Sequence, residues 1–172
     1  RRAMFLRVGD PVTIREPGLA FEMVNITLSY RGALVASQGA DADTLGEAIS
    51  RAVERCVKDK RFGGYMTASQ VDGTVIEILV QLSSSDIDNS SLGAVELAIA
   101  WGVDGIELWD GPKRTYFKPG VPLTKRWKNH RVMLTRLCRK AKLDDDAWMK
   151  PEVTLRRTSW LHWVETPDGP VE

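Results

Sequence analysis

The sequence predicts an α+β fold, with a mixed, largely antiparallel sheet and helices packed against it. Several stretches alternate apolar and polar residues, as a half-buried strand does, and two others place apolar residues at helical spacing. These stretches do not follow one another in the regular strand-helix order of a parallel α/β protein. Because 172 residues suffice for one core, we expect a single domain over residues 1–172, with its core at about 21–165.

The first two strands are predicted at residues 24–30 and 33–36. Residues 24–30 alternate apolar and polar side chains without a break, and residues 33–36 form a short apolar run. Between them stand Arg31 and Gly32, and glycine adopts a positive φ at little cost, so a tight turn is expected. The chain is expected to leave the sheet at residues 37–39.

The strongest helix is predicted at residues 44–58. Seven apolar residues form one stripe at helical period. Thr44 and Glu47 have the spacing of a capping box, in which each side chain binds a free backbone N–H at the helix start. Glu47 and Arg51 stand four residues apart, which favours an ion pair on the exposed face.

The rest of the chain supplies more strands and a second clear helix. Alternation predicts a strand at 75–82 and a closing strand at 153–164, with a loop at 83–91. A hairpin is predicted from 105–109 and 114–117, which flank a turn with glycine and proline. Helices are predicted at 92–101, ended by Gly102, and at 129–142, and residues 166–172 are expected to fray. Pro119, Gly120 and Pro122 predict a loop between the hairpin and the second of these helices.

Composition excludes several classes of protein. No apolar run approaches the roughly 20 residues that span a bilayer, and the basic N-terminal segment lacks a signal peptide's apolar run. We therefore expect a cytoplasmic location and no membrane partner. Cys56 and Cys138 fall at apolar helix positions, which predicts two buried thiols. With two cysteines and two histidines in the chain, neither a metal site nor a cofactor is expected.

Charge is strongly segregated although the whole chain is nearly neutral. Of 24 basic residues, eleven lie within residues 111–142, which contain no acid; 13 basic and 23 acidic residues remain elsewhere. Such a segment can bind a phosphate backbone or an acidic partner, and an aromatic residue such as Trp127 can add stacking. Alternatively, residues 144–146, all aspartates, neutralise it. The predicted surface for RNA or an acidic protein consists of Lys128, Arg131, Arg136, Arg139 and Lys140.

Several motifs together resemble the AMMECR domain family, of which the chain is identified as a divergent member. The family pattern has a strand, then Arg-Gly-Cys-Ile-Gly, then a helix ending in Asp-Pro-Arg-Phe. This chain has Asn-Ile-Thr-Leu at 25–28, Arg-Gly-Ala-Leu-Val at 31–35 and Asp-Lys-Arg-Phe at 59–62. The later family segments Gly-x-Asp-Gly, Thr-Phe-Leu-Pro and Leu-x-x-Lys-Ala-Gly-Leu are similar to residues 102–105, 115–119 and 137–143, followed by Trp148.

The resemblance implies a cleft at the Arg-Gly-Cys-Ile-Gly segment and a part in a modification pathway. Its members occur beside, or fused to, dioxygenase-like Memo proteins and radical SAM enzymes, which implies such a pathway partner. This chain departs from the motif, because Ala33 replaces its cysteine and Val35 its last glycine. A methyl group is no nucleophile, so chemistry that needs that cysteine is not available here.

The predicted site is a cleft around residues 30–38 that holds a small anionic ligand. Arg31 is its main candidate, because a guanidinium can hold a carboxylate or phosphate with two parallel hydrogen bonds. The alternative is a solvated hairpin arginine. The sequence does not decide between an enzyme and a binding domain, and no catalytic residue is assigned. The predicted ligand-binding residues are Arg31, Gly32, Asn25, Thr27, Ser37 and Tyr116.

Overall fold

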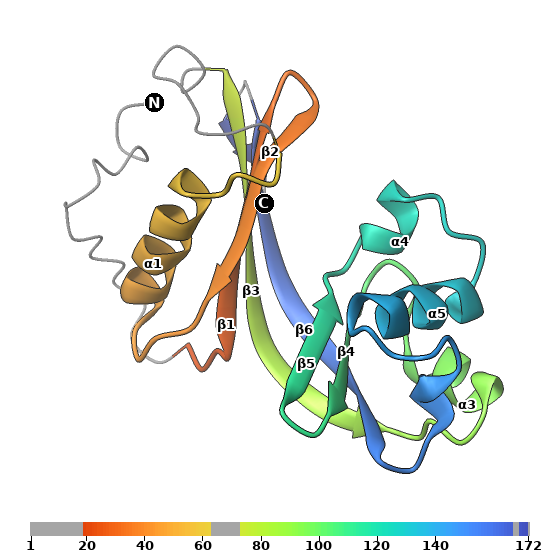
Figure 1. The fold of residues 1–172 in the computed structure, drawn as a ribbon. Coiled ribbons are helices and arrows are strands. Elements are labelled where there is room, and N and C mark those ends of the chain that lie inside the picture. Colours follow the sequence, from red (N-terminus) through yellow and green to blue (C-terminus); the bar gives the residue numbers. More distant parts are fainter. Residues whose placement is uncertain (1–18, 63–72, 167–168, 172) are drawn as a thin grey trace. The chain divides into compact units, whose positions relative to one another are not determined.

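The computed structural model describes residues 19–62, 73–166 and 169–171, and it confirms the α+β fold (Figure 1). Strands follow the order β2-β1-β3-β6-β4-β5, and β7 pairs with β6. The pairings β1–β2, β1–β3, β4–β5, β4–β6 and β6–β7 are antiparallel. In chain order the elements are β1 (Met23–Tyr30), β2 (Ala33–Ala40), α1 (Leu45–Val57), β3 (Thr74–Ile87), α3 (Leu92–Ala98), β4 (Gly105–Asp110), β5 (Lys113–Phe117), α4 (Val121–Thr124), α5 (His130–Lys140), η1 (Ala147–Met149), β6 (Val153–Thr166) and β7 (Gly169–Val171).

The chain divides into two compact units, each with its own apolar core. The first unit takes its described residues from 1–82 and 161–172, and the second unit is residues 83–160. Strands β3 and β6 each contribute residues to both units. In the first unit β1 and β2 pack against α1, and in the second unit α3 and α5 pack against β4 and β6.

In the first unit, the apolar face of the predicted strand packs against the apolar stripe of the predicted helix, as expected. Val24, Ile26 and Leu28 of β1 are buried together with the α1 stripe, whereas Asn25 and Thr27 alternate with them. The helix begins as predicted, since the Thr44 hydroxyl accepts a hydrogen bond from the Glu47 N–H at 3.3 Å. The predicted pair of Glu47 with Arg51 is also present.

The prediction that the chain leaves the sheet at residues 37–39 was wrong. Strand β2 continues to Ala40, which pairs with Val24 of β1. Polar composition suggested a break, but Ala36 and Ala40 are both buried, so the strand extends to bury them. The turn is confined to Arg31 and Gly32, with φ of 50° and 77° respectively.

The loop prediction for residues 83–91 was also wrong in its first half. Strand β3 runs on to Ile87 within the second unit, although its sequence there is polar. Cross-strand side-chain contacts to β6 accompany this extension. The Ser83 and Ser159 hydroxyls lie 2.8 Å apart, and Asp86 accepts from Arg156 Nε at 2.9 Å.

Three shorter predictions need correction. Helix α3 ends before Ile99, and Gly102 (φ 79°) lies in the turn that follows. Helix α4 forms where a loop was expected, and Pro122 is compatible with it because it stands in the first turn, where its missing N–H costs nothing. In the tail expected to fray, β7 forms and pairs with β6.

The second unit surrounds a large apolar core. The hairpin β4–β5 forms as predicted, with Asp110 opposite Lys113. Helix α5 begins at the predicted Asn129, whose side chain accepts from the Val132 N–H at 3.0 Å. Trp148 is the largest of the fully buried side chains. It lies in one cluster with Val95, Ile99, Ile106, Leu108, Met133, Leu134, Leu137, Cys138, Ala147, Val153 and Leu155.

Cys56 and Cys138 are both buried free thiols, as predicted. Within the described ranges, no group of three or more His, Cys, Asp or Glu side chains is placed to hold a metal ion. No helix among the described residues is long and apolar enough to cross a membrane.

Candidate functional site

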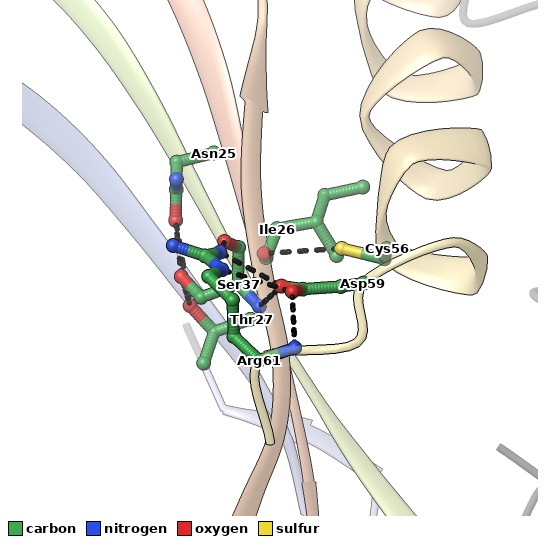
Figure 2. A network of polar contacts seen from close by, with 7 residues as sticks. All are labelled: Asn25, Ile26, Thr27, Ser37, Cys56, Asp59 and Arg61. Carbon is green, nitrogen blue, oxygen red and sulfur yellow. Dashed lines mark hydrogen bonds and ion pairs between the residues drawn. The ribbon is translucent and has the colours of Figure 1, made fainter. Parts of the chain in front are cut away.

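The register of β1 and β2 brings three of the predicted ligand-binding residues together. Thr27 stands directly opposite Ser37, and Asn25 is two residues from Thr27 on the same face. The Thr27 and Ser37 hydroxyl oxygens are 3.2 Å apart, and each lies 3.4 Å from Asn25 Oδ1 (Figure 2). Asn25 is 3% exposed, so the strands present a small polar cluster whose base is buried.

Asp59 and Arg61 complete this cluster from the segment that follows α1 (Figure 2). The Asp59 side chain is only 1% exposed, whereas that of Arg61 is 58% exposed. Arg61 Nε donates to Asp59 Oδ1 at 2.9 Å, and Arg61 Nη2 donates to Asp59 Oδ2 at 2.7 Å. Asp59 also accepts from the backbone N–H groups of Ser37 and Arg61, at 3.3 and 3.1 Å. We call Asn25, Thr27, Ser37, Asp59 and Arg61 the polar cluster.

Asp59 remains ionised and fixes the orientation of Arg61. The side-chain hydrogen bonds from Arg61 hold the pKa of Asp59 well below its ordinary value. Burial opposes this shift, while the backbone N–H groups of Arg61 and Ser37 add to it. A two-point contact between guanidinium and carboxylate fixes the plane of the guanidinium, and Arg61 Nη2 also donates to the Ser37 carbonyl.

Arg31 lies away from the polar cluster. It is exposed in the β1–β2 turn, with its guanidinium carbon 5.2 Å from the centre of the Tyr30 ring. It stands four positions after Thr27, which corresponds to about 13 Å along an extended strand. A Cβ at Gly32 would meet nothing within 4 Å, so lack of space does not require glycine there. Its positive φ does, because glycine adopts that conformation at little cost. Roles for Arg31 and Gly32 in ligand binding stay predictions.

Ala33 and Val35 mark the departure from the family motif. Ala33 is exposed at the start of β2 and pairs with Tyr30. The first unit does contain a cysteine, Cys56. It is buried on α1, where its thiol donates to the Ile26 carbonyl at 3.5 Å. Because this thiol is 4% exposed and lies on the helix side of the sheet, it does not replace the missing motif cysteine.

Tyr116 belongs to the second unit, where it stands on β5. Its ring stacks with that of Trp160 at a centroid distance of 6.4 Å. Lys140 Nζ donates to the Tyr116 carbonyl at 2.6 Å and lies 5.0 Å from the ring centre. Tyr116 is thus part of an aromatic and cationic surface of this unit, and its assignment to the ligand site stays a prediction.

A buried carboxylate in the second unit has no counterpart among the predicted site residues. Glu107 is 0% exposed and accepts hydrogen bonds from Arg114 Nη2 and from Trp109 Nε1, the latter at 3.0 Å. Arg114 also lies 5.2 Å from the centre of the Trp109 ring. The only signal in the sequence is the alternation of Glu107 with the buried Ile106 and Leu108.

The predicted basic surface is neutralised in part. Arg139 makes two contacts of 2.6 Å with Asp145, and its side-chain hydrogen bonds lower the pKa of that carboxyl. Lys140 is bound to the Tyr116 carbonyl. Lys128, Arg131 and Arg136 are exposed, and none of the three pairs with an acidic residue of the described chain.

Comparison with known proteins agrees with the motif resemblance. The sequence model of the AMMECR1 family matches residues 23–160. Among curated proteins, none matches this chain. The crystal structure of the uncharacterised protein PH0010 from Pyrococcus horikoshii is similar in fold, with a TM-score of 0.80 and 22% identity. The likeness covers 95% of this chain and 84% of that one. With the family match spanning most of its length, the chain belongs to the AMMECR1 family.

Proposed function

We propose that the first unit binds a small anionic ligand at the polar cluster, and that Arg61 is its main contact. One observation supports this proposal most directly. The buried carboxylate of Asp59 fixes the half-exposed guanidinium of Arg61, which also donates from Nη2 to the carbonyl of Ser37, the residue whose hydroxyl pairs with that of Thr27. The proposal retains three predicted ligand residues and moves the main contact from Arg31 to Arg61.

The donor set favours an oxyanion. A guanidinium and two hydroxyls all donate hydrogen bonds to carboxylate or phosphate oxygens. Because Asp59 offsets the charge of Arg61, binding depends on directed hydrogen bonds more than on net charge. Groups that are already fixed in the free protein lose little conformational entropy on binding, which favours affinity for a small ligand.

The proposal predicts that phosphate stabilises the protein through Arg61. A ligand that binds only the folded state raises the melting temperature, so phosphate should raise it relative to chloride at equal ionic strength. In Arg61→Gln this phosphate-dependent difference should disappear, whatever the variant's own stability. Thermal unfolding followed by far-ultraviolet circular dichroism measures it.

Arg31→Gln is the matched control, because Arg31 is also an exposed arginine of the first unit. It should retain the phosphate effect. Loss of the effect in Arg31→Gln alone would move the site to the turn, as the sequence first indicated. A protein that does not respond to phosphate or to simple carboxylates would contradict the proposal.

A second candidate function is binding of RNA by the basic surface. Three exposed cations that form no ion pair in the described chain, Lys128, Arg131 and Arg136, favour it, although Asp145 lies close enough to Arg136 for their charges to interact. An acidic protein is the alternative occupant, and the family resemblance suggests a Memo-like or radical SAM partner in a modification pathway. Either role is compatible with a ligand at the polar cluster, since that cluster belongs to the other unit.

Charge reversal tests this second function. Arg131→Glu with Arg136→Glu should weaken binding of a single-stranded RNA by about tenfold or more, since several phosphate contacts are lost. Affinity should also fall steeply with salt. Lys58→Glu is the control, because Lys58 is an exposed residue of the first unit. It should have little effect on RNA affinity. RNA affinity that does not change with salt would count against the idea, and binding of an acidic protein in its place would identify the alternative occupant.

A further inference from the structure

A carboxylate and an imidazole continue the polar cluster across the sheet of the first unit. Thr27 of β1 stands directly opposite Ser37 of β2 on one side and directly opposite Glu77 of β3 on the other. Residues directly opposite each other in an antiparallel pair share one face of the sheet. Next to β3 lies β6, whose His162 Nε2 is 2.9 Å from Glu77 Oε1. We call Ser37, Thr27, Glu77 and His162 the polar row.

The polar row lies on the face of the sheet away from α1. Ile26 and Leu28, the neighbours of Thr27 along β1, point to the other face and are buried in the core with α1. All four residues of the row belong to the first unit. The side chains of Glu77 and His162 are 31% and 49% exposed, so a dissolved ligand can reach both. The row therefore adds an accessible carboxylate and imidazole to the face that carries the two hydroxyls.

The spacing of the strands brings Glu77 close to the proposed anion site. Neighbouring strands lie about 4.8 Å apart, so the backbone of Glu77 is about 5 Å from that of Thr27 and about 10 Å from that of Ser37. A ligand whose oxyanion contacts the hydroxyls of Thr27 and Ser37 therefore lies one strand away from a carboxylate. A short extension of such a ligand along the row reaches Glu77.

The charge of Glu77 changes which ligand the site favours. Asp59 already offsets the charge of Arg61, and Glu77 adds a negative charge on the neighbouring strand. A ligand that carries only negative charge is repelled by this carboxylate, whereas an ammonium group on the ligand is attracted to it. A carboxylate accepts hydrogen bonds at two oxygens and an ammonium group donates them, so the two groups are also complementary in hydrogen bonding.

We propose that the ligand of the polar cluster is a small zwitterion, whose oxyanion contacts Arg61 and whose ammonium group contacts Glu77. Amino acids and aminoalkyl phosphates belong to this class. His162 is a positioning residue: because an ionised carboxylate only accepts hydrogen bonds, Nε2 donates to Glu77 and fixes its side chain. This inference rests on the proposed function, since the polar cluster must hold the oxyanion.

The test compares compounds that differ only in the ammonium group. Ethyl phosphate and 2-aminoethyl phosphate form one such pair, and propionate and β-alanine form the other. Isothermal titration calorimetry at pH 8 and equal ionic strength measures their affinities for the full chain. In the pair that binds, the compound with the ammonium group should bind about tenfold more tightly, a difference of about 1.4 kcal/mol. In Glu77→Gln, which removes the charge and keeps the size of the side chain, the two compounds should bind equally.

Glu54→Gln is the matched control, because Glu54 is an exposed glutamate of α1, on the other side of the sheet. It should keep the preference for the ammonium compound. His162→Ala should reduce this preference, and His162→Gln, which retains an N–H donor, should restore it. The preference is a ratio of two affinities measured in the same variant, so a change in the variant's stability does not alter it.

Arg61→Gln separates this inference from the proposed function. It should weaken binding of both compounds of a pair. If it does so while the unaltered protein does not distinguish the two compounds, or while Glu77→Gln keeps the preference, the zwitterion inference is overturned and the anion site stands. If both compounds bind Arg61→Gln as tightly as the unaltered protein, or if neither pair binds at all, the proposed function and this inference are both overturned.

Discussion

Replacing Asp59 by asparagine is expected to lower the free energy of unfolding by about 3 kcal/mol at neutral pH, because hydrogen bonds to a charged group contribute about 1.5–3 kcal/mol each. The carboxylate accepts from the side chain of Arg61 and from two backbone N–H groups while it is 1% exposed. An asparagine amide would turn an NH₂ group toward some of these donors. Urea denaturation followed by circular dichroism measures the loss.

The stability lost in Asp59→Asn should become smaller as the pH falls. The pKa of Asp59 is lower in the folded protein than its ordinary value of 3.8, mainly through the Arg61 hydrogen bonds. The unfolded chain therefore takes up the proton first, and the stability that Asp59 contributes is present above about pH 4 and falls as the pH drops further. The difference between the unaltered protein and Asp59→Asn should be constant from pH 7 to about 5 and shrink below about 4.

Asp43→Asn is the control for Asp59→Asn. Asp43 is exposed just before α1, and a surface change of this kind usually alters stability by about 0.5 kcal/mol or less. Equal stabilities of Asp59→Asn and the unaltered protein at pH 7 would show that the polar cluster is not organised by this carboxylate. A stability difference between the two proteins that stays constant below about pH 4 would show the same.

Replacing Trp148 by alanine is expected to cost about 4 kcal/mol, since removal of a buried aromatic side chain loses its transfer free energy and leaves a cavity. Trp148 is 1% exposed and lies against α5 and the sheet of the second unit. The Asn89 side chain binds the Trp148 carbonyl at 2.7 Å and the Val153 carbonyl at 2.9 Å. These contacts use the backbone, so they survive the substitution and the loss reports on packing.

Met149→Ala is the matched control, because Met149 is the next residue and is 44% exposed. It should cost less than about 1 kcal/mol, as surface substitutions usually do. Both variants are compared by urea denaturation. A cost for Trp148→Ala as small as that of Met149→Ala would mean that the core of the second unit is not built around this side chain.

Local signals predicted the elements whose pattern lies within one segment. The apolar stripe and the Thr44 cap predicted α1, and the alternation at 24–30 predicted β1 with Asn25 and Thr27 on one face. Neither inference needs to know what lies across the sheet. The same holds for the turn at Arg31 and Gly32, which depends on backbone conformation alone.

The remaining features depend on contacts between distant segments. Residues 37–39 are polar, yet they continue β2 because β1 pairs with them and because Asp59 and Arg61 bind the edge groups of Ser37. Ser37 was expected to contribute through its side chain in a turn, and it contributes from a strand. The roles of Asp59 and Arg61 become visible only when the end of α1 is placed beside that strand.

Buried charge was the other feature hidden from the sequence. Glu107 sits in a strand among apolar residues, and only the β4–β5 register reveals its partner. Arg114 lies opposite Trp109, two residues from Glu107, which brings the guanidinium to the carboxylate. For the same reason, the neutralisation of Arg139 by Asp145 could be suspected from sequence but not distinguished from an open basic face.

Binding of a small anion by Arg61 is tested most directly by native mass spectrometry of the full chain purified from cell extract under non-denaturing conditions. We expect a co-purifying carboxylate or phosphate compound on the unaltered protein and on Arg31→Gln, and its loss from Arg61→Gln. The mass of the bound species would then identify the ligand class. If the unaltered protein carries no small molecule, or if Arg61→Gln retains it, the polar cluster is a structural contact between α1 and β2 and not a binding site.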